Sequence, residues 1–155
     1  MDSVEPVTLG WREWLALPQL GIPSIKAKVD TGARTSSLHV DSLQTQERDG
    51  ITWLNFRVSS TGRKIGGLYE CSAPAIARRM VTDSGGRASL RWFIRTPVEL
   101  AGERFDAEIN LTDRRNMLFP MLFGRLALGD RFVVDPSASY RCGKPRHARS
   151  ARTAP

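Results

Sequence analysis

The sequence is poor in the features that mark several large protein classes. It holds only two cysteines, Cys71 and Cys142, and two histidines among 155 residues. Two cysteines are too few for a disulfide-rich secreted scaffold. The longest apolar run is only a few residues, which argues against a membrane-spanning helix. Residues 1–6 are acidic and lack the apolar stretch of a signal peptide. These absences predict a cytoplasmic protein without a membrane partner.

The positive charge of the chain is concentrated at one end. Hydrophobic residues make up 41% and charged residues 25%, which is ordinary for one globular domain. The net charge is +7, yet residues 141–155 hold five Lys/Arg and no acid. Such a tail is typically disordered, although a basic tail can also contact nucleic acid or another polyanion. Because this tail has no aromatic residue and no nucleic-acid motif, we expect a solvated tail and no nucleic-acid partner.

Short strand-like runs separated by turn residues fill the rest of the chain. Ile25–Val29 alternates apolar and basic residues, as a half-buried strand does. Asp49-Gly50 lies between the runs Ser42–Arg48 and Ile51–Ser59 and predicts a hairpin. Only Gly124–Leu128 looks helical. Further strands are predicted at Thr8–Leu17, Thr35–Val40, Ile76–Thr82, Ala88–Thr96, Val98–Leu100, Phe105–Leu111 and Arg131–Val134, with turns at 21–23, 61–62 or 66–67, 83–86 and 101–104.

This pattern predicts an all-β domain, a closed barrel or a sandwich, with one short C-terminal helix. We expect an N-terminal extension over residues 1–8, the domain over residues 9–140 and the basic disordered tail over residues 141–155.

Asp30-Thr31-Gly32, directly after the strand Ile25–Val29, is the first candidate for chemistry. An aspartate at a strand's end can sit on a tight turn with its carboxylate projecting, and Gly32 allows another backbone or a substrate to approach closely. Hydroxyl groups nearby, such as that of Ser36, can hold the turn through local hydrogen bonds. The tripeptide alone is more typical of an ordinary Asp turn.

Met121–Leu128 is the second candidate, an apolar strand that runs through Gly124 into the short helix. Alone it fits a plain core strand and cap. In this order, the two segments resemble the retropepsin-like aspartic proteases, and most closely a bacterial group labelled ATP-dependent zinc proteases, associated with ATP-grasp enzymes that ligate glutamate to ribosomal protein S6. The segments that carry the resemblance are 10–14 with 17–18, 26–39, 94–97, 122–125 and 132–136.

The resemblance implies a closed retropepsin-like (acid protease) β-barrel and a hydrolase, an aspartic endopeptidase. Such enzymes need two carboxylates that share one proton. This chain has one Asp-Thr-Gly, so it must act as a homodimer in which Asp30 of each chain activates water. The implied catalytic residues are Asp30, Thr31 and Gly32. The implied substrate-binding or loop-supporting residues are Ala33, Arg34, Thr35, Ser36, Gly66, Gly67, Gly124 and Arg125.

Two features depart from the family pattern. Many viral members continue Asp-Thr-Gly-Ala-Asp-Asp-Thr, whereas Arg34 and Thr35 stand here in place of the two acids. Arg125 would lose its usual acidic partner and could pair instead with Asp130 or Asp135. A mobile flap is also expected over the site. Its tip would be the glycine-containing segment 64–68, which a plain hairpin explains equally well.

Other functions were weighed against the peptidase. Neither His-Glu-x-x-His nor Cys-x-x-Cys is present, and a zinc site from Asp30, His39 and Cys71 has no support in spacing, so no metal is predicted. No phosphate-binding glycine motif is present either, so no cofactor is predicted and an ATP link would come from a ligase partner. Lys26, Lys28 and Arg34 flank Asp30 and suit an acidic protein or peptide substrate. The alternatives are a non-catalytic β-barrel module that binds a protein, or a zinc-dependent peptidase.

Overall fold

The computed structural model describes residues 5–60, 67–83, 85–113 and 118–145. Within them the regular secondary structure is almost entirely β-strand, with one short α-helix and one 3-10 turn. The elements are β1 (Val7–Leu9), β2 (Arg12–Leu17), η1 (Pro18–Leu20), β3 (Ile22–Val29), β4 (Ser36–His39), β5 (Ser42–Arg48), β6 (Ile51–Ser59), β7 (Leu68–Pro74), β8 (Ala77–Thr82), β9 (Ala88–Leu100), β10 (Glu103–Thr112), β11 (Met121–Phe123), α1 (Arg125–Leu128) and β12 (Phe132–Val134). The predicted all-β class and the short C-terminal helix are confirmed.

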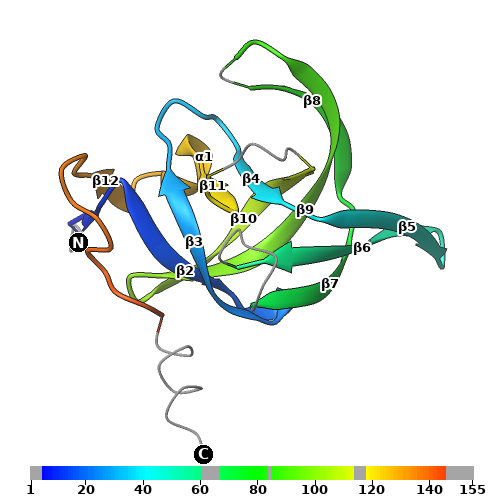
Figure 1. Ribbon diagram of the computed structural model, residues 1–155, viewed down its shortest axis with the longest axis horizontal. Helices are drawn as coiled ribbons and strands as arrows, with labels where there is room; N and C mark the ends of the chain where they lie inside the picture. Colours follow the sequence, from blue (N-terminus) through cyan, green and yellow to red (C-terminus); the bar gives the residue numbers. More distant parts are fainter. Residues whose placement is uncertain (1–4, 61–66, 84, 114–117, 146–155) are drawn as a thin grey trace, which may run out of the picture.

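Six strands form a closed ring, in the order β10-β4-β11-β3-β2-β9, because β9 also pairs with β10. The closed architecture expected from the sequence is therefore present as a ring of strands (Figure 1). β8 pairs with β9 and extends the sheet beyond the ring. A separate three-stranded sheet, β5-β6-β7, projects to one side (Figure 1).

The core is formed by the ring strands together with β6 and β7, and it follows from strand alternation. Ile25, Ala27 and Val29 of β3 are buried, whereas Lys28 between them is exposed. Three phenylalanines from different parts of the chain, Phe56, Phe93 and Phe123, are almost completely buried. Removing this apolar surface from water is the main favourable contribution to folding.

Two-residue turns connect the hairpins where the sequence carries the matching residues. Asp49 and Gly50 have φ of 51° and 80°, which suits the twist of β5 and β6 and confirms the predicted hairpin. The turn predicted across 101–104 is shorter than expected. Ala101 and Gly102 alone form it, with φ of 54° and 78°, so β10 already begins at Glu103.

Three other predicted boundaries are wrong. The run Thr8–Leu17 is split into β1 and β2 at Gly10, whose missing side chain lets the backbone of Ala138 pack against it. The turn predicted at 21–23 is confined to Gly21, with φ of 75°, since β3 begins at Ile22. β9 continues through Pro97, because the fixed φ of proline is compatible with extended backbone.

The two ends of the domain are joined by β1, which pairs in parallel with β12. Val7 lies opposite Phe132, and Leu9 opposite Val134. Among the described residues, no helix is long and apolar enough to cross a membrane.

Candidate active site

Asp30 lies at the end of β3, on a turn that its own side chain stabilises. The Asp30 backbone N–H donates to the carbonyl of Phe123 at 2.9 Å, and the Asp30 carbonyl accepts from the N–H of Ala33 at 3.3 Å. Asp30 Oδ1 accepts from the Gly32 N–H at 3.0 Å. The Asp30 side chain is half-buried, so its second oxygen can face a ligand. The carboxylate is thus held on the turn and remains accessible.

β11 lies between β3 and β4, parallel to the first and antiparallel to the second. The backbone N–H of Arg125 donates to the carbonyl of Ala33 at 2.7 Å, and that of Leu126 to the carbonyl of Arg34 at 3.0 Å. These bonds tie the first turn of α1 to the segment that follows Asp30, called here the Asp30 loop (residues 30–35). The two segments that were singled out in the sequence are therefore in direct contact.

Gly124 is required at the contact between β11 and the Asp30 loop. A Cβ atom there would lie 2.5 Å from the Thr35 carbonyl oxygen and 3.0 Å from the Ser36 nitrogen. The Gly124 N–H donates to Ser36 Oγ at 2.9 Å. Glycine thus lets the two backbones approach, and the Ser36 hydroxyl satisfies a buried donor, as a loop-supporting role predicts.

Asn110 of β10 stabilises the Asp30 loop from the opposite side. Its side chain is fully buried and makes four hydrogen bonds. The amide donates to Thr35 Oγ1 at 3.1 Å and to the Ser36 carbonyl at 2.9 Å. Its oxygen accepts from Ser37 Oγ and from Arg91 Nη1, each at 2.9 Å. This network joins β9, β10 and β4 beneath the loop.

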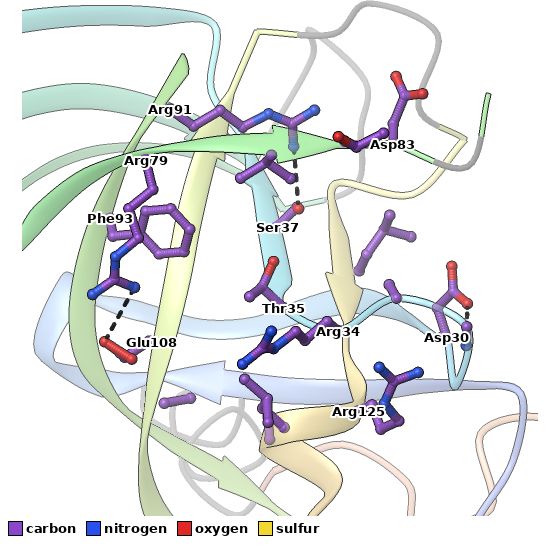
Figure 2. Close-up of a pocket in the computed structure, with 18 of the residues that line it drawn as sticks. Asp30, Arg34, Thr35, Ser37, Arg79, Asp83, Arg91, Phe93, Glu108 and Arg125 are labelled. Carbon is purple, nitrogen blue, oxygen red and sulfur yellow. Dashed lines mark hydrogen bonds and ion pairs between the residues drawn. The ribbon is translucent and has the colours of Figure 1, made fainter. Parts of the chain in front are cut away.

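A cleft of about 960 Å³ opens beside Asp30. Residues of the Asp30 loop and α1 line one side, and β8 with the turn after it lines another, as Figure 2 shows for Arg79 of β8 and Asp83 of the turn. Two acids of the cleft lie close to arginines, with Glu108 3.9 Å from Arg79 and Asp106 3.8 Å from Arg95. The third, Asp83, accepts backbone N–H bonds within its own turn.

Arg125 lies near the Asp30 loop, as predicted, but with a different partner. Its Nη1 lies 3.3 Å from the carbonyl oxygen of Thr31 and donates a hydrogen bond to it. The carboxylate of Asp135, one of the two acids predicted to pair with it, instead accepts from Ser137. Those Ser137 bonds lower the pKa of Asp135.

Of the two glycines predicted to form a flap, the structure describes only Gly67, and Gly67 does not line the cleft. Gly67 packs against Ser60, and Gly66 lies outside the described residues. The strand that does reach over the cleft is β8, with Met80 63% exposed. Sequence reasoning also missed Arg91 and Asn110. They sit on strands without any motif, so no local signal could have found them.

The residues considered for zinc lie apart from one another. His39 Nε2 is 3.5 Å from Asp41 Oδ1, at the end of β4. Cys71 is buried, its Sγ lies 3.5 Å from the carbonyl oxygen of Leu20, and burial raises its pKa to about 11. Within the described parts of the chain, no three His, Cys, Asp or Glu side chains are grouped so that they could hold a metal ion.

Comparisons with known proteins place this geometry in context. A family model described as "Retropepsin-like aspartic endopeptidase RimB" matches residues 8–145. A "Probable alpha-L-glutamate ligase" from Desulfotalea psychrophila is 40% identical over 136 residues, which cover 88% of this chain and 29% of that protein. One from Shewanella pealeana is 38% identical over 138 residues, covering 88% and 30%. The chain thus spans less than a third of these relatives.

A solved structure also shares the fold. It is the crystal structure of a protein of unknown function from Legionella pneumophila, which superimposes with a TM-score of 0.74 at 26% sequence identity. The match covers 88% of this chain and 98% of that one.

Proposed function

This chain belongs to the RimB-like family of retropepsin-like aspartic endopeptidases, and from that premise we propose that it hydrolyses peptide bonds with Asp30 as its catalytic acid and base. The observation that supports this most directly is the position of Asp30. Its carboxylate lies in the cleft, while hydrogen bonds from α1 and Asn110 fix the loop that carries it. A catalytic group needs such fixed geometry.

The second carboxylate comes from a second copy of the chain. The other acids that line the cleft, Asp83, Asp106 and Glu108, already have partners of their own. A homodimer that brings the Asp30 residue of each copy together supplies the missing carboxylate. Thr31 supports the paired loops, and Gly32 leaves room for the substrate backbone.

Hydrolysis then needs one proton shared between the two carboxylates. The ionised carboxylate takes a proton from water while the protonated one donates to the substrate carbonyl, and the water oxygen bonds to the carbonyl carbon. The carbon–nitrogen bond breaks as the amide nitrogen takes up a proton. The products are a carboxylate and an amine, so atoms and charge balance.

The substrate that best fits the cleft is an acidic peptide, rich in glutamate. Arg34 is exposed, lines the cleft and follows Asp30 closely, and Arg125 lies beside Thr31 (Figure 2). Two guanidinium groups in the same cleft as the Asp30 carboxylate favour a substrate with carboxylate side chains. The relatives are named as glutamate ligases, which supports a glutamate-containing substrate and a ligase as working partner.

The test is hydrolysis of oligoglutamate and of neutral peptides, followed by mass spectrometry. Asp30→Asn should abolish hydrolysis and leave the fold intact. Asp49→Asn, in a hairpin turn that accepts asparagine, is the matched control. Arg34→Gln should reduce cleavage of oligoglutamate more than that of neutral peptides. Full activity of Asp30→Asn would show the assignment to be wrong.

Two further measurements address the dimer and the metal. Sedimentation across a range of concentrations should show that activity rises with the dimer fraction, and an active strict monomer would contradict the shared carboxylates. Hydrolysis that stops with EDTA and returns with zinc would instead favour the metal-dependent alternative.

A further inference from the structure

We propose that the outer face of β2 and β3, together with the C-terminal segment packed on it, binds single-stranded nucleic acid. This cation–aromatic face consists of Arg12, Trp14, Lys26, Lys28, Tyr140 and Lys144. None of these residues lines the cleft beside Asp30. The inference is therefore independent of the proposed peptidase activity.

Strand pairing brings the first four residues together. In the antiparallel pair of β2 and β3, Arg12 lies opposite Lys28 and Trp14 lies opposite Lys26. The residues between them, Glu13 and Ala27, are fully buried, so the alternation turns the other four outward. Along β2 and β3 the outward positions 12, 14, 24, 26 and 28 include three basic residues and no acid.

The C-terminal segment is fixed along the edge of β2, beside this face, by Glu13 and by backbone hydrogen bonds. The buried carboxylate accepts the backbone N–H groups of Arg141 at 3.0 Å and Cys142 at 3.1 Å, as well as that of Gly10 at 2.6 Å. The Tyr140 N–H also donates to the carbonyl of Arg12 at 2.9 Å. Figure 1 shows this segment, in orange, running beside β2. Glu13 is thus committed to backbone donors below the surface and does not lie among the exposed cations.

Cations and aromatic rings alternate across the face. The Arg12 guanidinium lies 4.9 Å from the Tyr140 ring centroid, and the ammonium groups of Lys26 and Lys144 lie 5.4 Å and 4.7 Å from that of Trp14. The rings of Trp14 and Tyr140 are 5.7 Å apart. Proteins that bind single strands use this combination, because phosphates pair with the cations and bases stack on the rings.

The sequence beyond the described segment adds to the same charge. Residues 146–155 contain three arginines, one histidine and no acid. The expectation of no nucleic-acid partner depended on the absence of both aromatic residues and a nucleic-acid motif from the tail. The structure supplies aromatic rings beside the start of the tail from elsewhere in the chain, because the Lys144 ammonium lies 4.7 Å from the Trp14 ring centroid. An acidic peptide would offer carboxylates but no planar bases to stack on the rings.

The first experiment measures fluorescence anisotropy of a labelled oligouridylate of about 12 nucleotides with the full chain, across a salt series. Each phosphate contact contributes about 0.7 to the slope of log K against log salt for single strands. Lys26→Gln/Lys28→Gln should therefore make the slope shallower by about 1.4. The matched control is Arg48→Gln, since Arg48 also stacks on a tryptophan, Trp53, but lies on β5. Circular dichroism verifies that each variant folds.

Further variants distinguish binding by the cation–aromatic face from binding by the basic tail and from general attraction between charges. In a background with Arg146, Arg149 and Arg152 replaced by glutamine, Lys26→Gln/Lys28→Gln should still make the slope shallower by about 1.4. Asp30→Asn should bind the RNA as the wild type does.

Three outcomes would overturn the proposal. One is the absence of binding at ~100 µM protein and about 50 mM salt. Even non-specific binding has dissociation constants of about 100 µM or below at physiological salt, and lower salt strengthens it. Another is an unchanged slope in the double lysine variant. The third is equal displacement of the RNA by oligoglutamate of the same charge.

Discussion

Replacing Gly124 with alanine tests whether the close contact between β11 and the Asp30 loop positions the Asp30 carboxylate, which we propose to be catalytic. The new Cβ would lie 2.5 Å from the Thr35 carbonyl oxygen, whereas ordinary contacts begin at 3.4 Å. One of the two backbones must therefore move by about 0.9 Å. Neither is free to do so, because Ser36 is hydrogen-bonded to Asn110 and to the Gly124 N–H.

The expected cost follows from this geometry. Overpacking a tightly packed site costs about 1–3 kcal/mol, and rigid backbone on both sides puts this substitution near the upper value. For a domain of this size each kcal/mol lowers the melting temperature by about 2–4 °C, so we expect a fall of roughly 6–12 °C. A displacement near 1 Å at a catalytic group can also reduce the rate by about 100-fold.

The assay compares thermal unfolding and peptide hydrolysis of Gly124→Ala with those of Gly85→Ala. At Gly85 the nearest atom to a new Cβ is Asp83 Oδ1, at 3.3 Å, so a shift of about 0.1 Å restores an ordinary contact. The control should keep the wild-type melting temperature. If Gly124→Ala melts and cleaves like the control, the contact does not position the Asp30 loop and the reasoning is refuted.

Three further changes probe other buried groups. Asn110→Ala removes four hydrogen bonds of about 1 kcal/mol each, so the free energy of unfolding measured in urea should fall by about 4 kcal/mol. The control Asn55→Ala, at a half-buried position, should lower it by less than about 1 kcal/mol. Equal losses in the two variants would contradict the role of the Asn110 network. Glu13→Gln places an amide donor against backbone N–H groups, so the free energy of unfolding should fall by about 1–3 kcal/mol. An unchanged melting temperature would show that the Glu13 carboxylate does not hold the C-terminal segment. Burial raises the pKa of Cys71 from 9.0 to about 11, so its thiolate should be about 100-fold scarcer at pH 8 in the folded than in the unfolded chain. Labelling of the folded protein with a thiol reagent should be slower in proportion. Subtracting the labelling of Cys71→Ala gives the rate for Cys71 alone. The neutral thiol stabilises the fold below pH 9.0, and this contribution should be lost as the pH rises through about 11, which unfolding curves of the same pair can measure.

The features that could be predicted are those with a local cause. Asp49-Gly50 carries a positive-φ turn in its own sequence, and Gly124–Leu128 carries its helix, so both were located correctly. The turn at Asp30 was also recognisable from neighbouring residues. Its contact with the segment around Gly124 was expected only through the resemblance, since 90 residues separate the two in the sequence.

The features that could not be predicted depend on distant strands. Asn110 meets Thr35 because β10 pairs with β4, and a single polar residue in a strand does not reveal such a partner. In the same way, the β8 wall of the cleft follows from the pairing of β8 with β9. Arg125 was assigned an acidic partner on charge alone, whereas the structure offers it the carbonyl of Thr31.

The central position of β11 has a consequence for the order in which this protein is assembled. β3 and β4 are complete by residue 39, but the strand that lies between them begins only at residue 121. Until residues 121–128 have left the ribosome, the Asp30 N–H cannot donate to the Phe123 carbonyl. The carbonyls of Ala33 and Arg34 likewise lack the N–H groups of α1. Pairings so far apart in sequence close late and slowly. A nascent or truncated chain therefore carries Asp30 but lacks the hydrogen bonds that form the Asp30 loop, so under the proposed function incomplete copies would be inactive.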